Sequence, residues 1–425
     1  MISYGIHALS IYTIFMPKSN LFRDIRTGKF KKIYLDYAAS VEANPSSIHA
    51  VGLEAKKELE NARVEVANVL GARSEEIIFT SGGTESNNLA IQGIVNAWEL
   101  GSQKGAELPK LPHIITTNIE HPSVLETCKM FQKRKQAEIS IVPVEENGII
   151  DPKKIKKKIK ANTVLVSVMY ANNEIGTIQP IREIAREIKH YRKVSGKDSP
   201  SVAEGLSFPI FHTDAVQAAN YLDINVQKLG VDLLSLSGSK IQKAGRVGIL
   251  YKKKSTPLAA IFGGGHQEQG LRPGTENLPE ILKFSKAFNS VQKNKEKESK
   301  RLTQLQNHFI KKIRKVSKVG LGTEIIINGD LENRLPSNIN ITFPKIPSDL
   351  LVIELSAKGV MVSPKSACKS LDSGGSYVIQ AIHPELDPAV GGVRFSFGQG
   401  TTKADIDYTI KVLKQILLKL KKWYN

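Results

Sequence analysis

The stretch Val231-Asp-Leu-Leu-Ser-Leu-Ser-Gly-Ser-Lys240 joins an apolar, strand-like run to a tight Ser/Gly turn that ends in a lysine. Similar apolar runs recur along the chain and alternate with helical patterns. These runs are Ile77–Thr80, Ile114–Thr117, Ile139–Val142, Val164–Met169, Ile210–Thr213, Leu233–Leu236 and Val247–Tyr251. The alternation predicts an α/β domain with a mostly parallel, seven-stranded sheet covered by helices on both faces.

The length of 425 residues favours two domains. We expect an N-terminal extension over residues 1–30, a large domain over 31–290 and a small C-terminal domain over 291–425. Residues 279–317 read as a long polar helix that links the two domains. The small domain is predicted to be α+β, with elements at Ser337–Phe343, Leu350–Lys358, Gly392–Phe397 and Lys403–Trp423.

The composition excludes some classes of protein. No apolar run approaches the roughly 18 residues that span a bilayer. Two cysteines in the whole chain argue against a disulfide framework and suit a reducing, cytoplasmic compartment. The net charge of +19 comes largely from Lys153–Lys160, Lys293–Arg301 and Lys411–Lys422. Such runs are usually solvated helix faces; the alternative is a surface for an acidic protein or RNA. Because no aromatic residues interleave with them, direct nucleic-acid binding is disfavoured.

Lys240 is a candidate functional residue because of Asp214, which ends another apolar run 26 residues earlier. A lysine in a turn, one strand–helix unit beyond a strand-end aspartate, suits an enzyme that uses pyridoxal phosphate (PLP). The amine forms the Schiff base, and the carboxylate keeps the pyridine nitrogen protonated. The alternative is that Asp214 only caps the helix that follows.

Three other motifs also follow predicted strands. Ser81–Ser86 contains glycines and opens a helix, so it suits an anion such as a phosphate, although a plain capped turn is the alternative. The imidazole of His121 could stack on a cofactor ring and move protons, or be structural. The amide of Asn172 could orient a substrate carboxylate or the cofactor's phenolic oxygen, or form an Asx turn.

The two cysteines differ in their surroundings. Cys368 lies in a small, polar loop between Lys365 and Lys369, whose charges favour the thiolate, so it is a candidate nucleophile. Cys128 lies in a helical pattern and is predicted to be a packing residue. Arg394 alternates with apolar neighbours on a predicted strand, and its planar guanidinium suits a substrate carboxylate.

Together these residues resemble the cysteine desulfurases of the class-V aminotransferase family. The resemblance runs from Ile33-Tyr-Leu-Asp-Tyr-Ala-Ala39 and Asn44-Pro-Ser-Ser-Ile-His49 to the C-terminal helix. Its motifs occur in family order at Ser81–Ser86, Glu120–His121, Asn172–Gly176, Thr213–Gln217, Lys240, Gly263–His266 and Arg272–Asn277. The long loop around Cys368 is similar to that of the subgroup that supplies sulfur for iron–sulfur cluster assembly and tRNA thiolation.

This resemblance implies the fold of PLP fold type I and a set of cofactor contacts. Lys240 would carry PLP and later act as the base at the substrate Cα. Asp214 would pair with the ring nitrogen, Gln217 with the phenolic oxygen, and His121 would stack on the ring. The phosphate and the turn beneath it would involve Gly83, Thr84, Ser237, Ser239 and, from the other subunit of a homodimer, Thr275.

The resemblance also implies the substrate and the sulfur acceptor. Asn172 and Arg394 would take the carboxylate of L-cysteine, and Cys368 would attack its sulfur, leaving alanine and an enzyme persulfide. A protein partner, either a cluster scaffold or a tRNA-thiolation enzyme, would then receive the sulfur. The alternative within the same fold is another PLP-dependent lyase or an aminotransferase, and Cys368 speaks against it because transamination needs no thiol.

The chain departs from the family pattern at three places. Ser239 stands where many members have histidine, and Lys243–Arg246 replaces a Gly-Pro-Lys-Gly turn. Only Val41–Ala43 separates the two N-terminal motifs, where the family has a short helix. We expect the third departure to reshape the arm near the active-site entrance.

Overall fold

The computed structural model describes residues 33–40, 43–102, 111–195, 208–320, 324–364 and 375–424. Its largest element is a seven-stranded sheet in the order β1-β7-β6-β5-β4-β2-β3. The strands are β1 (Ile77–Thr80), β2 (His113–Thr117), β3 (Glu138–Val142), β4 (Thr163–Ser167), β5 (Ile210–Asp214), β6 (Leu233–Ser237) and β7 (Gly248–Lys252). Only β7 runs against the others. The predicted α/β sheet is therefore confirmed, strand by strand.

Helices cover both faces of this sheet and produce two hydrophobic cores. One core takes in α2 (Ala50–Leu70), α5 (Pro152–Lys158), α6 (Ile181–Ser195), α7 (Val226–Leu229) and the first half of α8 (Leu278–Gly320). The other takes in α3 (Gly83–Ser102) and α4 (Pro122–Lys133). Short 3-10 helices are η1 (Ser74–Glu76), η2 (Gly238–Lys240) and η3 (Gln267–Gly270). Because both faces are covered, the strands read as continuous apolar runs.

Helix α6 shows how the sequence selects these faces. Ile181, Ile184 and Ile188 are buried at a spacing of three and four residues, whereas most of the charged side chains between them are exposed or half-buried. Such a stripe lies on one side of a helix with 3.6 residues per turn, so burying it against the sheet removes apolar area from water. A charged residue at Ile184 would break this packing.

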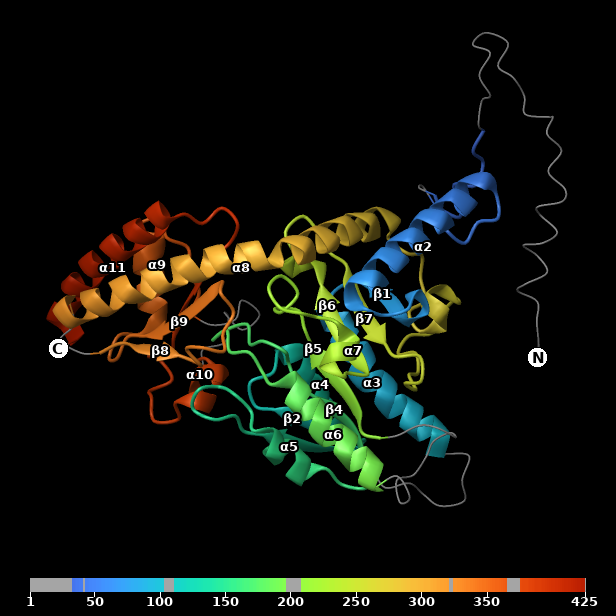
Figure 1. The fold of residues 1–425 in the computed structure, drawn as a ribbon, viewed down its shortest axis with the longest axis horizontal. Coiled ribbons are helices and arrows are strands. Elements are labelled where there is room, and N and C mark those ends of the chain that lie inside the picture. The colour runs from blue at the N-terminus through green and yellow to red at the C-terminus, as the bar shows by residue number, and fades with distance from the viewer. Residues whose placement is uncertain are drawn as a thin grey trace, which may run out of the picture.

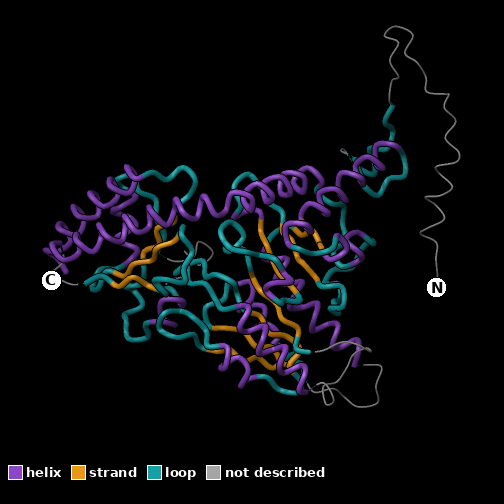
Figure 2. Tube along the Cα trace, viewed as in Figure 1, coloured by secondary structure: helices purple, strands orange, loops and turns teal. Residues whose placement is uncertain are grey.

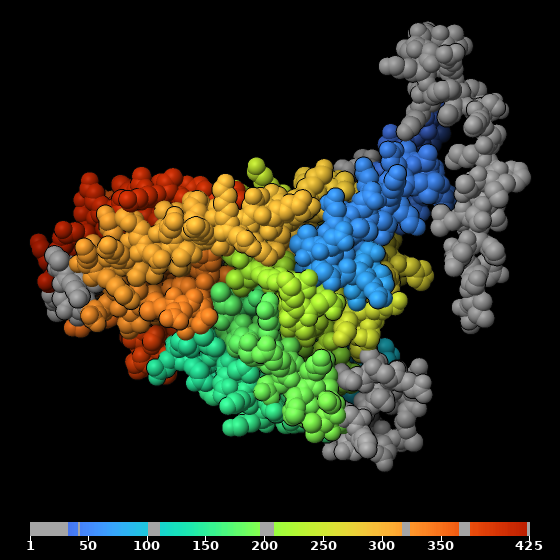
Figure 3. Space-filling model, in the orientation of Figure 1, coloured from blue at the N-terminus to red at the C-terminus, as the bar shows by residue number. Residues whose placement is uncertain are grey.

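The second domain is built on the other half of α8, which runs along both domains (Figures 1 and 3). Its sheet has the order β10-β9-β8, visible as a separate group of strands in Figure 2. Its elements are β8 (Ile326–Asn328), β9 (Asn338–Thr342), α9 (Ser348–Ser356), β10 (Val393–Ser396) and α11 (Lys403–Tyr424). Phe309 and Ile313 of α8 lie in the same core as α9 and α11. The long linking helix predicted at 279–317 is thus observed, three residues longer at its end.

Helix α10 (Tyr377–Ile382) falls within the range expected for the small domain. Its Val378, Ile379 and Ile382, however, pack in the core beneath the large sheet. The chain therefore leaves the small domain after Ser363, returns to the large one at α10, and crosses back to β10. The sequence reasoning missed this crossing because α10 is short and carries no distinctive periodicity.

In the parts of the chain that the structure describes, no helix is long and apolar enough to cross a membrane.

Buried His212 on β5 should make stability depend on pH. Its ring nitrogens lie 2.8 Å from Ser167 Oγ and 2.9 Å from Ser235 Oγ, and burial lowers its pKa to about 3. An unfolded histidine has a pKa of about 6.5, so the unfolded chain binds the extra proton between these values. The stability that neutral His212 contributes is therefore fully present above about pH 6.5 and is lost as the pH falls toward about 3.

We expect the His212→Gln variant to lose this dependence. Between about pH 6 and about pH 4, the free energy of unfolding of the wild type should fall more steeply than that of the variant, by about 1.4 kcal/mol per pH unit. Urea unfolding at several pH values measures both slopes. Parallel curves would contradict a neutral His212 in the folded protein.

Candidate active site

A cavity opens at the carboxyl ends of the parallel strands, where ligand sites of such sheets occur. Most of the residues predicted from the sequence line it. These are Gly83, Thr84, His121, Asp214, Gln217, Ser237, Ser239, Lys240 and Arg394. The structure thus brings together side chains from four strand ends and from the small domain.

Lys240 ends the short helix η2 directly after β6. Its backbone carbonyl accepts a hydrogen bond of 2.6 Å from Asn220 Nδ2, which fixes the turn. Gly238 is required there, because a Cβ atom would lie 2.8 Å from the carbonyl oxygen of Gly245. The tight turn leaves the lysine side chain at the cavity, as predicted.

Asp214 ends β5 and is 5 % exposed. Its carboxylate accepts hydrogen bonds from Asn87 Nδ2 at 2.7 Å and from the backbone N–H of Val216 at 3.0 Å. Among the described residues it forms no ion pair with a lysine or arginine. A buried carboxylate without a cation suits a ligand that brings one, and a pyridinium nitrogen is such a group.

Another part of the cavity lining suits an anion. Gly83 and Thr84 begin the 20-residue helix α3, whose N-terminus carries a partial positive charge. The hydroxyls of Ser237 and Ser239 lie 2.9 Å apart beside it. A Cβ atom on Gly83 would come within 2.9 Å of Val216 Cγ2, so the glycine keeps this space open. A lysine, a buried carboxylate and this cradle together fit PLP.

His121 is the N-cap residue of α4, which fixes its ring. Its Nδ1 accepts from the backbone N–H of Ser123 at 3.1 Å and lies 2.7 Å from Ser123 Oγ. Burial lowers the pKa of His121; the charges of Asp214 and Glu174 oppose this effect and that of Lys240 adds to it. The imidazole therefore stays neutral in the folded protein near neutral pH.

Asn172 does not fit the role expected for it. The side chain is 0 % exposed; its Nδ2 donates to the carbonyl of Ile119, and its Oδ1 accepts from the N–H groups of Glu174 and Ile175. It therefore forms the Asx turn that was the alternative reading. Its neighbour Asn173 lines the cavity instead.

Arg394 enters the cavity from β10 of the small domain. Its Nη1 donates to the carbonyl of Asn173 at 2.9 Å. Its buried Nε and the Oδ1 of Asn173 have no hydrogen-bond partner among the described residues. Burial lowers the pKa of Arg394, and Glu174 opposes the shift. A half-buried guanidinium with an unused donor fits a carboxylate ligand.

Cys368 lies outside the described residues, but the chain on both sides of it is anchored at this cavity. Before it, the backbone of Ser363 pairs with that of Arg394. After it, Ser376 Oγ donates to Glu174 Oε2 at 2.6 Å, and Tyr377 Oη donates to the carbonyl of Glu120 at 2.6 Å. Glu174 and Glu120 adjoin residues that line the cavity, Asn173 and His121.

Cys128 is a packing residue, as predicted. It is 0 % exposed in the core under α3 and α4, and burial raises its pKa to about 12. A thiol in this state is not a nucleophile.

Thr275 lies at a second hollow that is lined also by Glu85, Gly263 and Arg272. It is exposed and does not line the cavity around Lys240 of its own chain. This position agrees with a role in another subunit, and that role stays a prediction.

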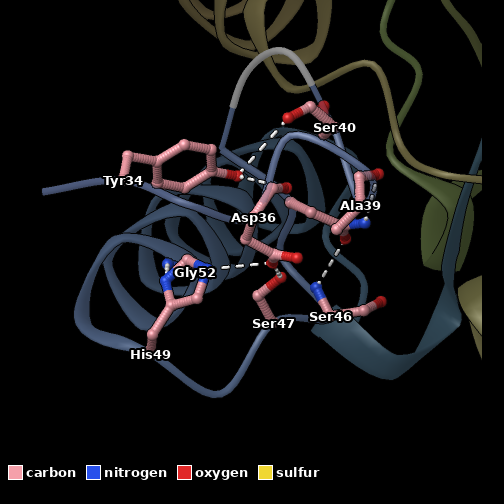
Figure 4. A network of polar contacts seen from close by, with 9 residues as sticks. Tyr34, Asp36, Ala39, Ser40, Ser46, Ser47, His49 and Gly52 are labelled. Carbon is pink, nitrogen blue, oxygen red and sulfur yellow. Dashed lines mark hydrogen bonds and ion pairs between the residues drawn. The ribbon is translucent and has the colours of Figure 1, made fainter.

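The N-terminal arm keeps its two motifs together despite the short connection between them (Figure 4). Asp36 Oδ2 accepts from Ser47 Oγ at 3.1 Å and lies 3.2 Å from His49 Nε2. His49 Nδ1 in turn accepts from the N–H of Gly52 and so caps α2. Of the shortened segment, residues 41 and 42 lie outside the described residues, and its effect on the entrance stays a prediction.

Sequence reasoning missed three polar residues that line the cavity. Asn87 lies one turn into α3, Ser123 lies in the first turn of α4, and Asn173 adjoins Asn172, the asparagine that was predicted. The polar run Ser86-Asn87-Asn88 at the start of an otherwise apolar helix was an available signal. The contacts themselves join different elements and leave no local pattern.

The fold and this cavity define a PLP-dependent enzyme of fold type I. Known proteins agree. The sequence profile of the aminotransferase class-V family matches residues 28–409, so the chain belongs to that family. Cysteine desulfurase IscS of Dictyoglomus turgidum is 40 % identical over 92 % of this chain and 96 % of its own length.

Solved structures give the same result. A NifS-like protein superposes with a TM-score of 0.75 at 32 % identity and covers 88 % of this chain and 91 % of its own. SspA, solved in complex with cysteine, superposes with a TM-score of 0.65 at 30 % identity, covering 84 % and 90 %.

Proposed function

We propose that this protein is a PLP-dependent cysteine desulfurase, which converts L-cysteine to L-alanine and passes the sulfur to Cys368. The observation that carries the proposal is the convergence of Lys240, Asp214 and Arg394 on one cavity, with the described residues on both sides of Cys368 anchored beside it. Relatives named cysteine desulfurase match over almost the whole chain.

The residues that line the cavity would hold the cofactor and move protons. PLP, when bound, supplies an electron sink that weakens the bonds at the substrate Cα. Lys240 would hold the cofactor covalently and would take the proton from Cα. Asp214 would keep the ring nitrogen protonated, and Gln217 would contact the phenolic oxygen. Gly83, Thr84, Ser237 and Ser239, which line the same cavity, would receive the phosphate.

Arg394 and Asn173 would bind the substrate carboxylate, with Asn173 in place of Asn172. The planar guanidinium can bind both carboxylate oxygens, which sets the orientation of the substrate amine and sulfur. Since Arg394 also pairs through its backbone with Ser363, the carboxylate site adjoins the start of the segment that holds Cys368.

Replacing Arg394 with lysine should raise KM for L-cysteine about ten- to a hundredfold, because the charge remains while the two-point contact is lost. Steady-state sulfide release measures this change, and cofactor loading, followed by absorbance, should not change. An unaltered KM would place the substrate carboxylate elsewhere.

In the sulfur-transfer step, the Cys368 thiolate attacks the sulfur of the bound L-cysteine. The S–S bond forms as the Cβ–S bond breaks, and the electron pair left on Cβ takes up a proton. The enzyme thiol is oxidised to a persulfide while the substrate carbon is reduced, so L-cysteine plus enzyme thiol gives L-alanine plus enzyme persulfide.

The proposal is tested by incubating the PLP-loaded protein with L-cysteine and a reductant and measuring alanine and sulfide together. Equal amounts of both products support the desulfurase. Pyruvate with sulfide and no alanine would indicate another lyase. Amino-group transfer to an added 2-oxo acid, without sulfide, would indicate an aminotransferase.

We also propose a cytoplasmic homodimer that delivers its sulfur to a protein acceptor for cluster assembly or tRNA thiolation. Support for the dimer comes from Thr275, which is exposed away from the cavity of its own chain. Acceptors would dock on the protein surface, and the lysine-rich helices α5 and α11 leave a positive charge for an acidic partner.

The domain limits at about residues 30 and 290 remain part of this proposal, with α10 assigned to the large domain.

A further inference from the structure

A chain of hydrogen bonds joins Asp214 on β5 to His121 before α4. Asn87 Nδ2 lies 2.7 Å from Asp214 Oδ2 and 2.8 Å from Ser123 Oγ. Ser123 Oγ lies 2.7 Å from His121 Nδ1. Asn87 and Ser123 are both buried, and all four residues line the cavity.

The chemistry of these groups fixes where the protons lie. A carboxylate only accepts, so the atom of Asn87 that faces Asp214 is the amide nitrogen and not the oxygen. The same nitrogen donates its second proton to Ser123 Oγ. Ser123 Oγ keeps one proton to donate, and it donates this proton to His121 Nδ1, because Nδ1 already accepts from the backbone N–H of Ser123 and so carries no proton.

His121 Nδ1 therefore accepts from two donors, the hydroxyl and the backbone N–H of Ser123. A nitrogen that accepts carries no proton, so in the neutral ring the proton is on Nε2. The charge of Asp214 fixes the orientation of the Asn87 amide, and the backbone N–H of Ser123 fixes the tautomer of His121.

We propose that Asn87 and Ser123 are positioning residues that hold His121 in the neutral Nε2–H form and couple that form to the carboxylate of Asp214. In this form His121 donates a proton through Nε2 and does not act as a base there. The inference deepens the proposed function and rests on it only for the identity of the cofactor that Asp214 faces.

Other groups also act on His121. The charges of Asp214, Lys240 and Glu174 act on its ring, Arg394 shares its cavity, and Glu120 precedes it in the chain. The two donors aimed at Nδ1 add to the effect of burial, since they oppose protonation at that atom. Without Asn87, Ser123 Oγ could turn and accept from a protonated Nδ1. The pKa of His121 should then rise although His121 itself is unchanged.

The test follows the titration of His121 by NMR in PLP-loaded protein with isotope-labelled histidine. The His121→Gln variant identifies the signal. In Asn87→Ala and in Ser123→Ala, we expect the pKa of His121 to rise by about one unit, a tenfold larger protonation constant. Ser123→Thr keeps the hydroxyl and should restore the wild-type titration.

Asn88→Ala is the matched control. Asn88 follows Asn87 in α3, but its Nδ2 donates to the carbonyl of Thr84 and does not contact Asp214. This variant should titrate as the wild type does, and thermal unfolding should show all variants folded. An unchanged pKa of His121 in both alanine variants, or a proton on Nδ1 in the wild type, would overturn the inference.

Desulfuration is measured in the same samples. A wild-type protein with the expected His121 titration but no alanine from L-cysteine would defeat the proposed function and leave the hydrogen-bond chain standing. Normal desulfuration with a proton on Nδ1 would support the proposed function and overturn the inference about His121.

Discussion

Replacing Cys368 with alanine is expected to abolish the release of sulfide from L-cysteine, with the loss limited only by the detection of the assay. The physical reason is that alanine has no electron pair with which to accept the substrate sulfur. Binding of L-cysteine should persist, because Lys240, Asp214 and Arg394 are intact. The expected signature is therefore a change in cofactor absorbance on adding L-cysteine, without product.

Cys128→Ala provides the control for this experiment. The chain has only two cysteines, and Cys128 is buried with its pKa raised to about 12. Replacing Cys128 with alanine should leave a small cavity that lowers the free energy of unfolding, while sulfide release stays nearly unchanged. Sulfide release that persists in Cys368→Ala would show that sulfur leaves without an enzyme thiol, as in a direct lyase.

The Asp214→Asn variant should slow turnover of L-cysteine by about two to three orders of magnitude. An amide cannot stabilise a protonated ring nitrogen, so the charge that develops after loss of the Cα proton is no longer offset. The variant also disturbs its own surroundings. Asn87 and Val216 both donate to position 214, and a single amide oxygen replaces two carboxylate oxygens.

The readouts for Asp214→Asn separate these effects. Exchange of the Cα proton of L-alanine with deuterated water measures the proton-transfer step without any thiol. Thermal unfolding and cofactor affinity report whether the cavity persists. Near-normal exchange in a loaded variant would remove the role assigned to Asp214.

The sheet could be predicted because buried parallel strands leave a strong local signal. Each strand is a short apolar run between polar turns, and strands such as Ile77–Thr80 and Leu233–Ser237 are buried along their whole length. That Lys240 and Asp214 share one cavity could be predicted for a related reason. Asp214 ends one strand, Lys240 follows the next, and the carboxyl ends of parallel strands meet at one edge of the sheet.

Other features depended on contacts that no local pattern encodes. Asn172 and Asn173 are neighbours with the same side chain. Only the Asx turn shows that Asn172 is the one whose side chain binds the backbone, which leaves Asn173 for the cavity. The bond between Asn87 and Ser123 joins α3 to α4 over 36 residues. Helix α10 packs against the core of the large domain, and no pattern in its six residues indicates this contact.

The central claim is that sulfur passes from L-cysteine to Cys368. It is tested most directly by treating the PLP-loaded protein with a small excess of L-cysteine, without reductant, and analysing its peptides by mass spectrometry. The account predicts one added sulfur atom on the peptide containing Cys368, none on that containing Cys128, and at least one alanine formed for each added sulfur. Alanine formed with both peptides unmodified would contradict it.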